Sequence, residues 1–427
     1  MTIYIGIAAL LLLLVTGVPV ALALLLTGTL GLYMVGGTQL LVGILGTTPL
    51  SSVQNYEFLA IPMFILMANL IISSGVSDDM FEVAKTWMGR TPGGLAHATA
   101  LTGAAFGAIS GSSTAAAATL SSTSIPGMLK QGYSPKLATG VVAISGTLAM
   151  LIPPSIAMVL YALIADMSVG KLLIAGVVPG LVITLTIMLT VAFLVWRNPA
   201  HAPRAQGYTW MEKIRSLRSA WTFIVLFLIV TGVIYSGIAT PTEASAFGAF
   251  GALCLSVLRK RSVKVIVDAL VVTAHASCMI AFIIVGALVF GYFMTMTQAT
   301  QQLIAFFAQS GLSKEVVLLL VLLLYLVLGC FMDLVAMLIL TVPVVHPLMV
   351  HLGYDPIWFA VIVVVMGEVG MVTPPLGMNV FVIAKYTGMP AAEIFKGSVP
   401  HVIAHLIAVG VLTLFPQIVL WLPYSMK

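Results

Sequence analysis

The chain has 427 residues, of which 61 % are hydrophobic and 7 % are Asp, Glu, Lys or Arg. Soluble proteins carry about 25 % charged residues, so a surface with so few charges must face mostly lipid, and the composition excludes a soluble globular protein. The formal net charge is +5, but no basic run is interleaved with aromatic residues, which excludes a nucleic-acid-binding surface.

Apolar segments long enough to cross a bilayer recur along the whole chain. The first, residues 3–23, lacks a basic start and a convincing cleavage site, so we expect a retained membrane span rather than a signal peptide. Segments of about 92–125 and 313–350 are too long for one crossing and contain Gly, Ser or Pro near the middle, which predicts two re-entrant helical hairpins. Segments of about 137–165 and 357–386 contain Pro-Pro, which predicts helices with an unwound centre.

Two hydrophilic loops hold many of the basic residues. They are residues 197–219 and 259–264, and the positive-inside rule places both in the cytoplasm. Residues 198–219 therefore read as a basic cytoplasmic linker or helix. The linker separates a first half, residues 1–197, from a second half, residues 220–427.

The two halves contain an internal repeat. The stretch that starts at Ile125 aligns without a gap with the stretch that starts at His346, 221 residues later. All five prolines between residues 126 and 179 then fall on prolines, and the two Pro-Pro pairs coincide. Because Pro and Gly fix backbone shape, these matches indicate a duplicated fold rather than a shared composition.

The first half ends and the second begins at the same basic loop. If each half crosses the membrane an odd number of times, the repeats have opposite orientations and both termini lie on the side opposite the cytoplasm. Inverted repeats with broken helices at the midplane are the architecture of many secondary transporters. The predicted fold is therefore an all-α integral membrane protein with two inverted-topology repeats, each with a re-entrant hairpin and a broken Pro-Pro helix.

The predicted hairpin tips carry polar groups at bilayer depth. The first tip contains Ser110, Gly111, Ser112 and Ser113, and the repeat aligns Ser112 with a lone carboxylate, Asp333. Hydroxyls and free carbonyls are the oxygen ligands that a hard cation such as Na⁺ prefers, and an intramembrane acid predicts function. The alternatives are a small-residue packing seam at the first tip and a structural acid, satisfied by Ser or backbone N–H groups, at the second.

The Pro-Pro breaks are the second pair of candidates. Proline frees carbonyl groups one turn back, so each break exposes oxygens that could meet the hairpin tip of its own repeat. Half-helix N-termini at the same breaks could attract an anionic substrate. The alternative is a proline kink without function. The expected substrate contacts are Pro154, Ser155, Pro375, Gly377 and Asn379.

At these residues the chain resembles the large membrane subunit of tripartite ATP-independent periplasmic (TRAP) transporters, the DctM-like subunit. The resemblance extends over nearly the whole length. It is carried by residues 57–71, 107–120, 132–146, 151–155, 237–253, 331–347 and 373–382.

The resemblance implies a Na⁺-coupled, elevator-type transporter of the bacterial inner membrane. It implies a small four-helix membrane subunit and a soluble periplasmic substrate-binding protein as partners, besides membrane lipid. The substrate would be an organic acid such as a dicarboxylate or sialic acid. The implied Na⁺ ligands are Ser110, Gly111, Ser112 and Ser113 with Gly146 and Thr147, and Gly329 and Asp333 with Gly367 and Thr373.

Three alternatives stay open from the sequence. One is a proton-coupled carboxylate transporter that works without a binding protein. Another is an intramembrane enzyme, which needs a nucleophile paired with a base, yet no His lies in either hairpin tip or Pro-Pro break. The third is a structural scaffold, although duplicated breaks cost stability. The chain also lacks the G-x-x-x-x-G-K-[ST] loop, so we expect a secondary transporter rather than an ATP-hydrolysing enzyme.

Overall fold

The structure is a computed structural model that describes residues 2–203 and 207–425. Within that part of the chain all regular secondary structure is helical, and nine helices are long and apolar enough to cross a membrane. The predicted all-α membrane fold is therefore confirmed. Residues 204–206 of the predicted linker lie outside the described residues.

In the described chain the first half contains eleven α-helices and the second half contains ten. The first half contains α1 (Thr2–Val15), α2 (Val20–Gln54), α3 (Ala60–Ser74), α4 (Val76–Met88), α5 (Gly94–Ser110), α6 (Ser113–Thr123), α7 (Ile125–Lys130), α8 (Pro135–Gly146), α9 (Ile156–Ile164), α10 (Val169–Ala175) and α11 (Val177–Arg197). The second half contains α12 (Trp210–Tyr235), α13 (Pro241–Leu258), α14 (Val263–Met296), α15 (Ala299–Gln309), α16 (Lys314–Phe331), α17 (Leu334–His351), α18 (Pro356–Gly370), α19 (Met378–Thr387), α20 (Ala391–Leu414) and α21 (Gln417–Ser425). Short 3₁₀ turns cover Tyr56–Leu59, Thr147–Met150 and Pro199–His201.

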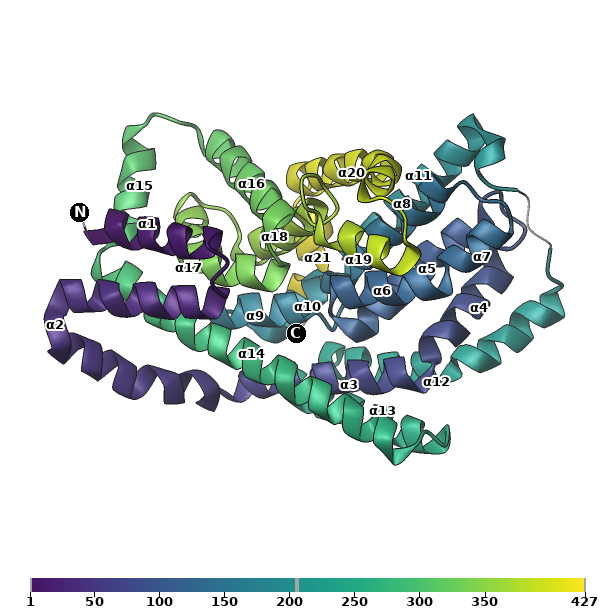
Figure 1. Cartoon of the computed structure of the whole chain (residues 1–427), viewed down its shortest axis with the longest axis horizontal. Helices are drawn as coiled ribbons and strands as arrows, with labels where there is room; N and C mark the ends of the chain where they lie inside the picture. The colour runs from purple at the N-terminus through teal and green to yellow at the C-terminus, as the bar shows by residue number, and fades with distance from the viewer. Residues whose placement is uncertain (1, 204–206, 426–427) are drawn as a thin grey trace.

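The helices form two layers (Figure 1). We call α1, α2, α3, α12, α13 and α14 the long-helix layer; within it α2 packs along α14 and α3 packs along α13. We call the two hairpins, the two broken helices and α10, α11, α20 and α21 the hairpin layer. Two helices connect the layers: α4 leads from α3 to α5, and α15 leads from α14 to α16.

Both predicted hairpins and both broken helices are present. The hairpins are α5–α6 and α16–α17, and the broken helices are α8–α9 and α18–α19. The repeats interlock, because α9 of the first packs against α17 of the second and α19 of the second packs against α6 of the first. Each broken helix therefore supports the returning arm of the other repeat's hairpin.

Local sequence explains where several helices begin and end. Glu243 caps the start of α13, because its carboxylate accepts from the Thr240 N–H while its own N–H donates to the Thr240 hydroxyl. This capping box, together with Pro241 in the first turn, explains why α13 begins here. The predicted continuous span 3–23 is wrong: α1 ends at Val15, because Gly17 has a φ of +83° and Pro19 cannot continue the preceding helix.

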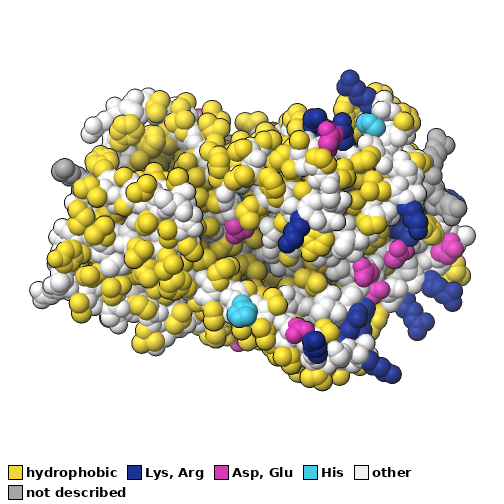
Figure 2. Space-filling view, in the orientation of Figure 1, with side chains coloured by type: hydrophobic (Ala, Val, Ile, Leu, Met, Phe, Trp, Pro, Cys, Tyr) yellow, Lys and Arg dark blue, Asp and Glu magenta, His cyan; other side chains and the backbone are white. Residues whose placement is uncertain are grey.

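Charge is distributed unevenly over the molecule. Figure 2 shows Lys and Arg gathered at one end, at the right of the view, whereas the N-terminus lies toward the left end in the same orientation (Figure 1). Two chain segments meet near the basic end, since the Ser134 N–H donates to the His201 carbonyl at 2.9 Å. This asymmetry is what the positive-inside rule expects of a membrane protein with one cytoplasmic face.

Candidate functional site

In each hairpin tip a polar side chain caps the start of the returning helix. In the first, α5 ends at Ser110, Gly111 adopts a φ of +54°, and the Ser112 side chain caps α6 by accepting from Ala115 N–H. In the second, the Asp333 carboxylate caps α17 by accepting from Val335 N–H at 3.1 Å. The residues that the repeat aligns therefore occupy equivalent cap positions, as the duplication predicts.

Both tips face one cavity of about 780 Å³ between the hairpin layer and the long-helix layer. Ser110, Ser112 and Asp333 line its hairpin side. Its opposite side comes from the long-helix layer and includes Asn69 on α3, whose amide donates to Thr273 of α14 at 3.1 Å. We call this space the tip cavity. It places hydroxyl, carboxylate and amide groups from three parts of the chain around one space.

In each repeat, one glycine among the predicted cation ligands lies close to the backbone of another predicted ligand. A Cβ on Gly146 would lie 3.1 Å from the Ser113 carbonyl oxygen, and a Cβ on Gly329 would lie 2.5 Å from the Gly367 carbonyl oxygen. Thr147 and Thr373 lie at the ends of the inner half-helices and donate their hydroxyls to their own helices, each at 2.6 Å. Carbonyl, hydroxyl and carboxylate oxygens suit a hard cation such as Na⁺, so the donor set fits the predicted ion.

The expected substrate contacts lie elsewhere, and none of the five residues lines the tip cavity. Pro154 and Ser155 are buried, and Ser155 caps α9. Pro375 is exposed, whereas Gly377 caps α19 and donates its N–H to the Cys330 carbonyl at 3.1 Å. Asn379 is fully buried, and neither polar atom of its amide has a hydrogen-bond partner within the described chain. Their role in substrate binding stays a prediction.

Glu368, at the end of α18, contacts the first hairpin tip but is not among the predicted site residues. Its side chain is 2 % exposed, and the Ser113 hydroxyl lies 2.6 Å from each of its carboxyl oxygens. No Lys, Arg or His in the described residues forms an ion pair with it. The contact joins the first hairpin tip to the second broken helix. The sequence does mark Glu368 as a candidate, because it is an acid within an apolar span, as Asp333 is.

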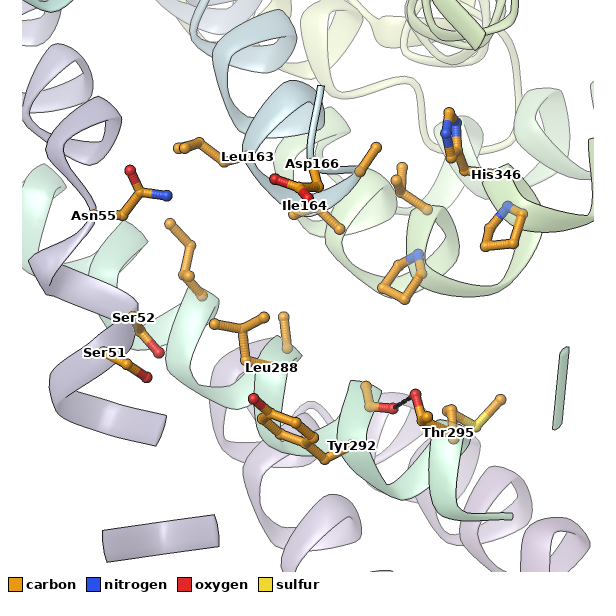
Figure 3. Close-up of a pocket in the computed structure, with 18 of the residues that line it drawn as sticks. Ser51, Ser52, Asn55, Leu163, Ile164, Asp166, Leu288, Tyr292, Thr295 and His346 are labelled. Atoms are coloured by element: carbon orange, nitrogen blue, oxygen red, sulfur yellow. Dashed lines mark hydrogen bonds between the residues drawn. The ribbon is translucent and has the colours of Figure 1, made fainter. Parts of the chain in front are cut away.

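A second cavity, of about 770 Å³, lies between the same two layers at the outer ends of α9 and α17. Figure 3 shows Asn55 and Asp166 on opposite walls, with their side chains directed toward each other across it. His346 lies on a further wall, and its Nδ1 is 2.9 Å from the Tyr161 hydroxyl. The interface between the layers is therefore hollow at two places.

Comparison with known proteins assigns the family. A family model described as the tripartite ATP-independent periplasmic transporter, DctM component, matches residues 7–418. The C4-dicarboxylate TRAP transporter large permease protein DctM of Pseudomonas aeruginosa is 37 % identical over 374 residues, which cover 87 % of each chain. The sialic acid TRAP transporter large permease protein SiaM of Vibrio cholerae is 30 % identical over 414 residues, which cover 96 % of each chain.

A solved structure has the same fold. The YdaH transporter of Alcanivorax borkumensis, whose structure is described as having an unusual topology, superposes with a TM-score of 0.68 over 98 % of this chain and 99 % of its own. At 14 % sequence identity, this likeness concerns the fold alone. The family match and the identities above go further: the chain belongs to the DctM component family of tripartite ATP-independent periplasmic transporters, and it is a multi-pass transporter subunit rather than an enzyme.

Proposed function

We propose that the chain carries a small organic acid, such as a C4-dicarboxylate or sialic acid, across the bacterial inner membrane by Na⁺ symport. The observation that carries this proposal is the tip cavity, where Ser112 and Asp333 from the two repeats face the long-helix layer across one space. The names of the DctM and SiaM relatives support the choice of substrate class.

Electrostatics gives a reason for the coupling. Two like unit charges about 4 Å apart interact by about 4 kcal/mol at an effective dielectric constant of about 20. A substrate carboxylate that entered the tip cavity beside an uncompensated Asp333 would meet repulsion of this order. Na⁺ held by Asp333 and the tip oxygens would remove the repulsion, so the anion would bind only after the cation.

The connections between the layers support an elevator-type movement. The connecting helix α4 lies between Gly75 and Gly93, and α15 lies between Gln298 and Gly311. All four flanking residues have positive φ angles, between +54° and +81°. Such turns change direction sharply without lengthening the helix on either side. We propose that the hairpin layer moves as one body along the long-helix layer, with α4 and α15 acting as hinged arms.

The family description supports the partners that we propose. Because the family is tripartite, we propose that the chain works with a small four-helix membrane subunit and with a soluble periplasmic binding protein that delivers the substrate. The basic end would lie in the cytoplasm and both termini in the periplasm.

The direct test is uptake into proteoliposomes that contain this chain with its small membrane subunit and its loaded binding protein. We expect uptake of a C4-dicarboxylate or of sialic acid only with an inward Na⁺ gradient and only with the binding protein. Uptake driven by a proton gradient in Na⁺-free buffer would replace the proposal with the proton-coupled alternative.

A further inference from the structure

A third hollow lies on the outer face of the hairpin layer, away from the tip cavity. It is a groove of about 1030 Å³ between α11 and α20. Its lining combines exposed aliphatic residues of both helices with Ala404 and Ala408, whose small side chains leave space. We infer that this groove is a binding site for one anionic phospholipid, with its acyl chains along the groove and its phosphate at Arg197.

The polar lining of the groove is concentrated at one end. Arg197, Asn198 and His201 lie there, where α11 ends and the following turn begins. Thr186 and Thr190 also line the wall, but each donates its hydroxyl to a carbonyl of its own helix, at 2.9 and 2.8 Å. The remainder of the groove therefore presents an apolar surface, which suits hydrocarbon chains and requires no hydrogen bonds from them.

The polar end is at the level of a membrane surface. Trp196, next to Arg197, is 79 % exposed, as expected of an aromatic residue at the boundary between hydrocarbon and headgroups. Arg197 is exposed, and among the described residues it forms no ion pair. The acid at the start of α20, Glu393, is already paired with Lys136 and Lys396. The Arg197 guanidinium can therefore bind a phosphate at the headgroup level.

The dimensions favour a lipid over a helix of another protein. Along α11 the groove extends from Val182 to Asn198, roughly 24 Å at a rise of about 1.5 Å per residue. A volume of about 1030 Å³ over that length gives a mean cross-section of roughly 40 Å². A helix with its side chains is about 10 Å wide and needs roughly 80 Å². Narrow, flexible acyl chains fit this cross-section, whereas a partner helix is too wide to lie fully within it.

The test counts phosphatidylglycerol molecules retained by the purified full-length chain in native mass spectrometry, after transfer from vesicles of phosphatidylethanolamine and phosphatidylglycerol. Ala404→Phe fills the groove, and Leu185→Phe, at an exposed position on α11 outside the groove lining, is its control. Arg197→Gln removes the charge at the groove end, and Lys264→Gln, an exposed residue on α14, is the matched charge control.

We expect the wild type and both controls to retain one phosphatidylglycerol. Arg197→Gln should weaken retention roughly fivefold, the effect of about one basic residue near a membrane surface. Ala404→Phe should abolish it. Equal retention by all five proteins would identify only annular lipid and overturn the site. Loss from Ala404→Phe with full retention by Arg197→Gln would overturn the selectivity for anionic lipid. Exclusion of the lipid when the small membrane subunit binds would show that the groove is a protein interface instead.

Discussion

The contact between Ser113 and Glu368 gives the sharpest prediction about how the two repeats hold each other. Both side chains are buried, and the Ser113 hydroxyl is the hydrogen-bond partner found for the carboxyl group within the described chain. Removing the partner of a buried polar group costs about 1–3 kcal/mol, because the group then lacks compensation for its desolvation. Ser113→Ala should therefore lower the stability of the hairpin layer by an amount in this range.

The same change should affect Na⁺ binding, because Ser113 lies in the first tip and against Gly146. If the whole energy of the contact holds the tip in its binding geometry, the Na⁺ concentration for half-maximal uptake should rise roughly tenfold to a hundredfold. The measurements are thermal unfolding of the purified protein and the Na⁺ dependence of uptake in proteoliposomes.

Ser121→Ala is the matched control for Ser113→Ala. Ser121 is also on α6 and buried, but its hydroxyl donates to the Ala117 carbonyl of its own helix at 2.6 Å. We expect this control to change the Na⁺ dependence little. If the two variants had the same Na⁺ dependence of uptake, the contact between Ser113 and Glu368 would have no part in ion binding.

Three further predictions concern the tip, the packing and the hinge. Ser112→Ala should raise the Na⁺ half-saturation only modestly, because the tip carbonyls remain; an unchanged value in uptake assays would count against the first ion site. Gly140→Ala should destabilise the protein by about 1–3 kcal/mol in thermal unfolding, because its Cβ would lie 2.2 Å from the Gly397 carbonyl oxygen of α20. Asp79→Asn removes the 2.6 Å ion pair with Arg259 beside the α3–α4 hinge. Because both groups are partly exposed, the free energy of unfolding should fall by less than about 1 kcal/mol. The maximal uptake rate should change. An unaltered rate would exclude the ion pair from the movement.

The sequence predicts the hairpins and the broken helices well, for a physical reason. Gly and Pro restrict or release particular backbone angles, so their repetition 221 residues apart fixes the same turns in both halves. The repeat aligns Ser112 with Asp333, and both are helix caps in the structure. The predicted continuous span 3–23 is wrong at residues 16–19. Hydrophobicity alone favours one span there, but Gly17 and Pro19 break the helix.

Contacts between distant parts of the chain could not be predicted from local patterns. Asn69 reaches the tip cavity because α3 lies opposite the hairpins, and its spacing along the sequence gives no sign of that position. The bond between Ser113 and Glu368 joins one repeat to the other, whereas the pattern suggested that each tip would meet the break of its own repeat. The expected substrate contacts rest on helix-terminus arguments and do not line the tip cavity, so their role stays a prediction.

A cation site at Asp333 can be tested by ²²Na⁺ binding and by Na⁺-driven substrate uptake, measured for wild-type and Asp333→Asn proteins that insert equally well. The variant should lose saturable ²²Na⁺ binding at one site and all Na⁺-dependent uptake, because no other carboxylate lines the tip cavity within the described residues. Undiminished uptake by the purified variant would contradict the proposed cation site, since the two repeats would then not meet at such a site.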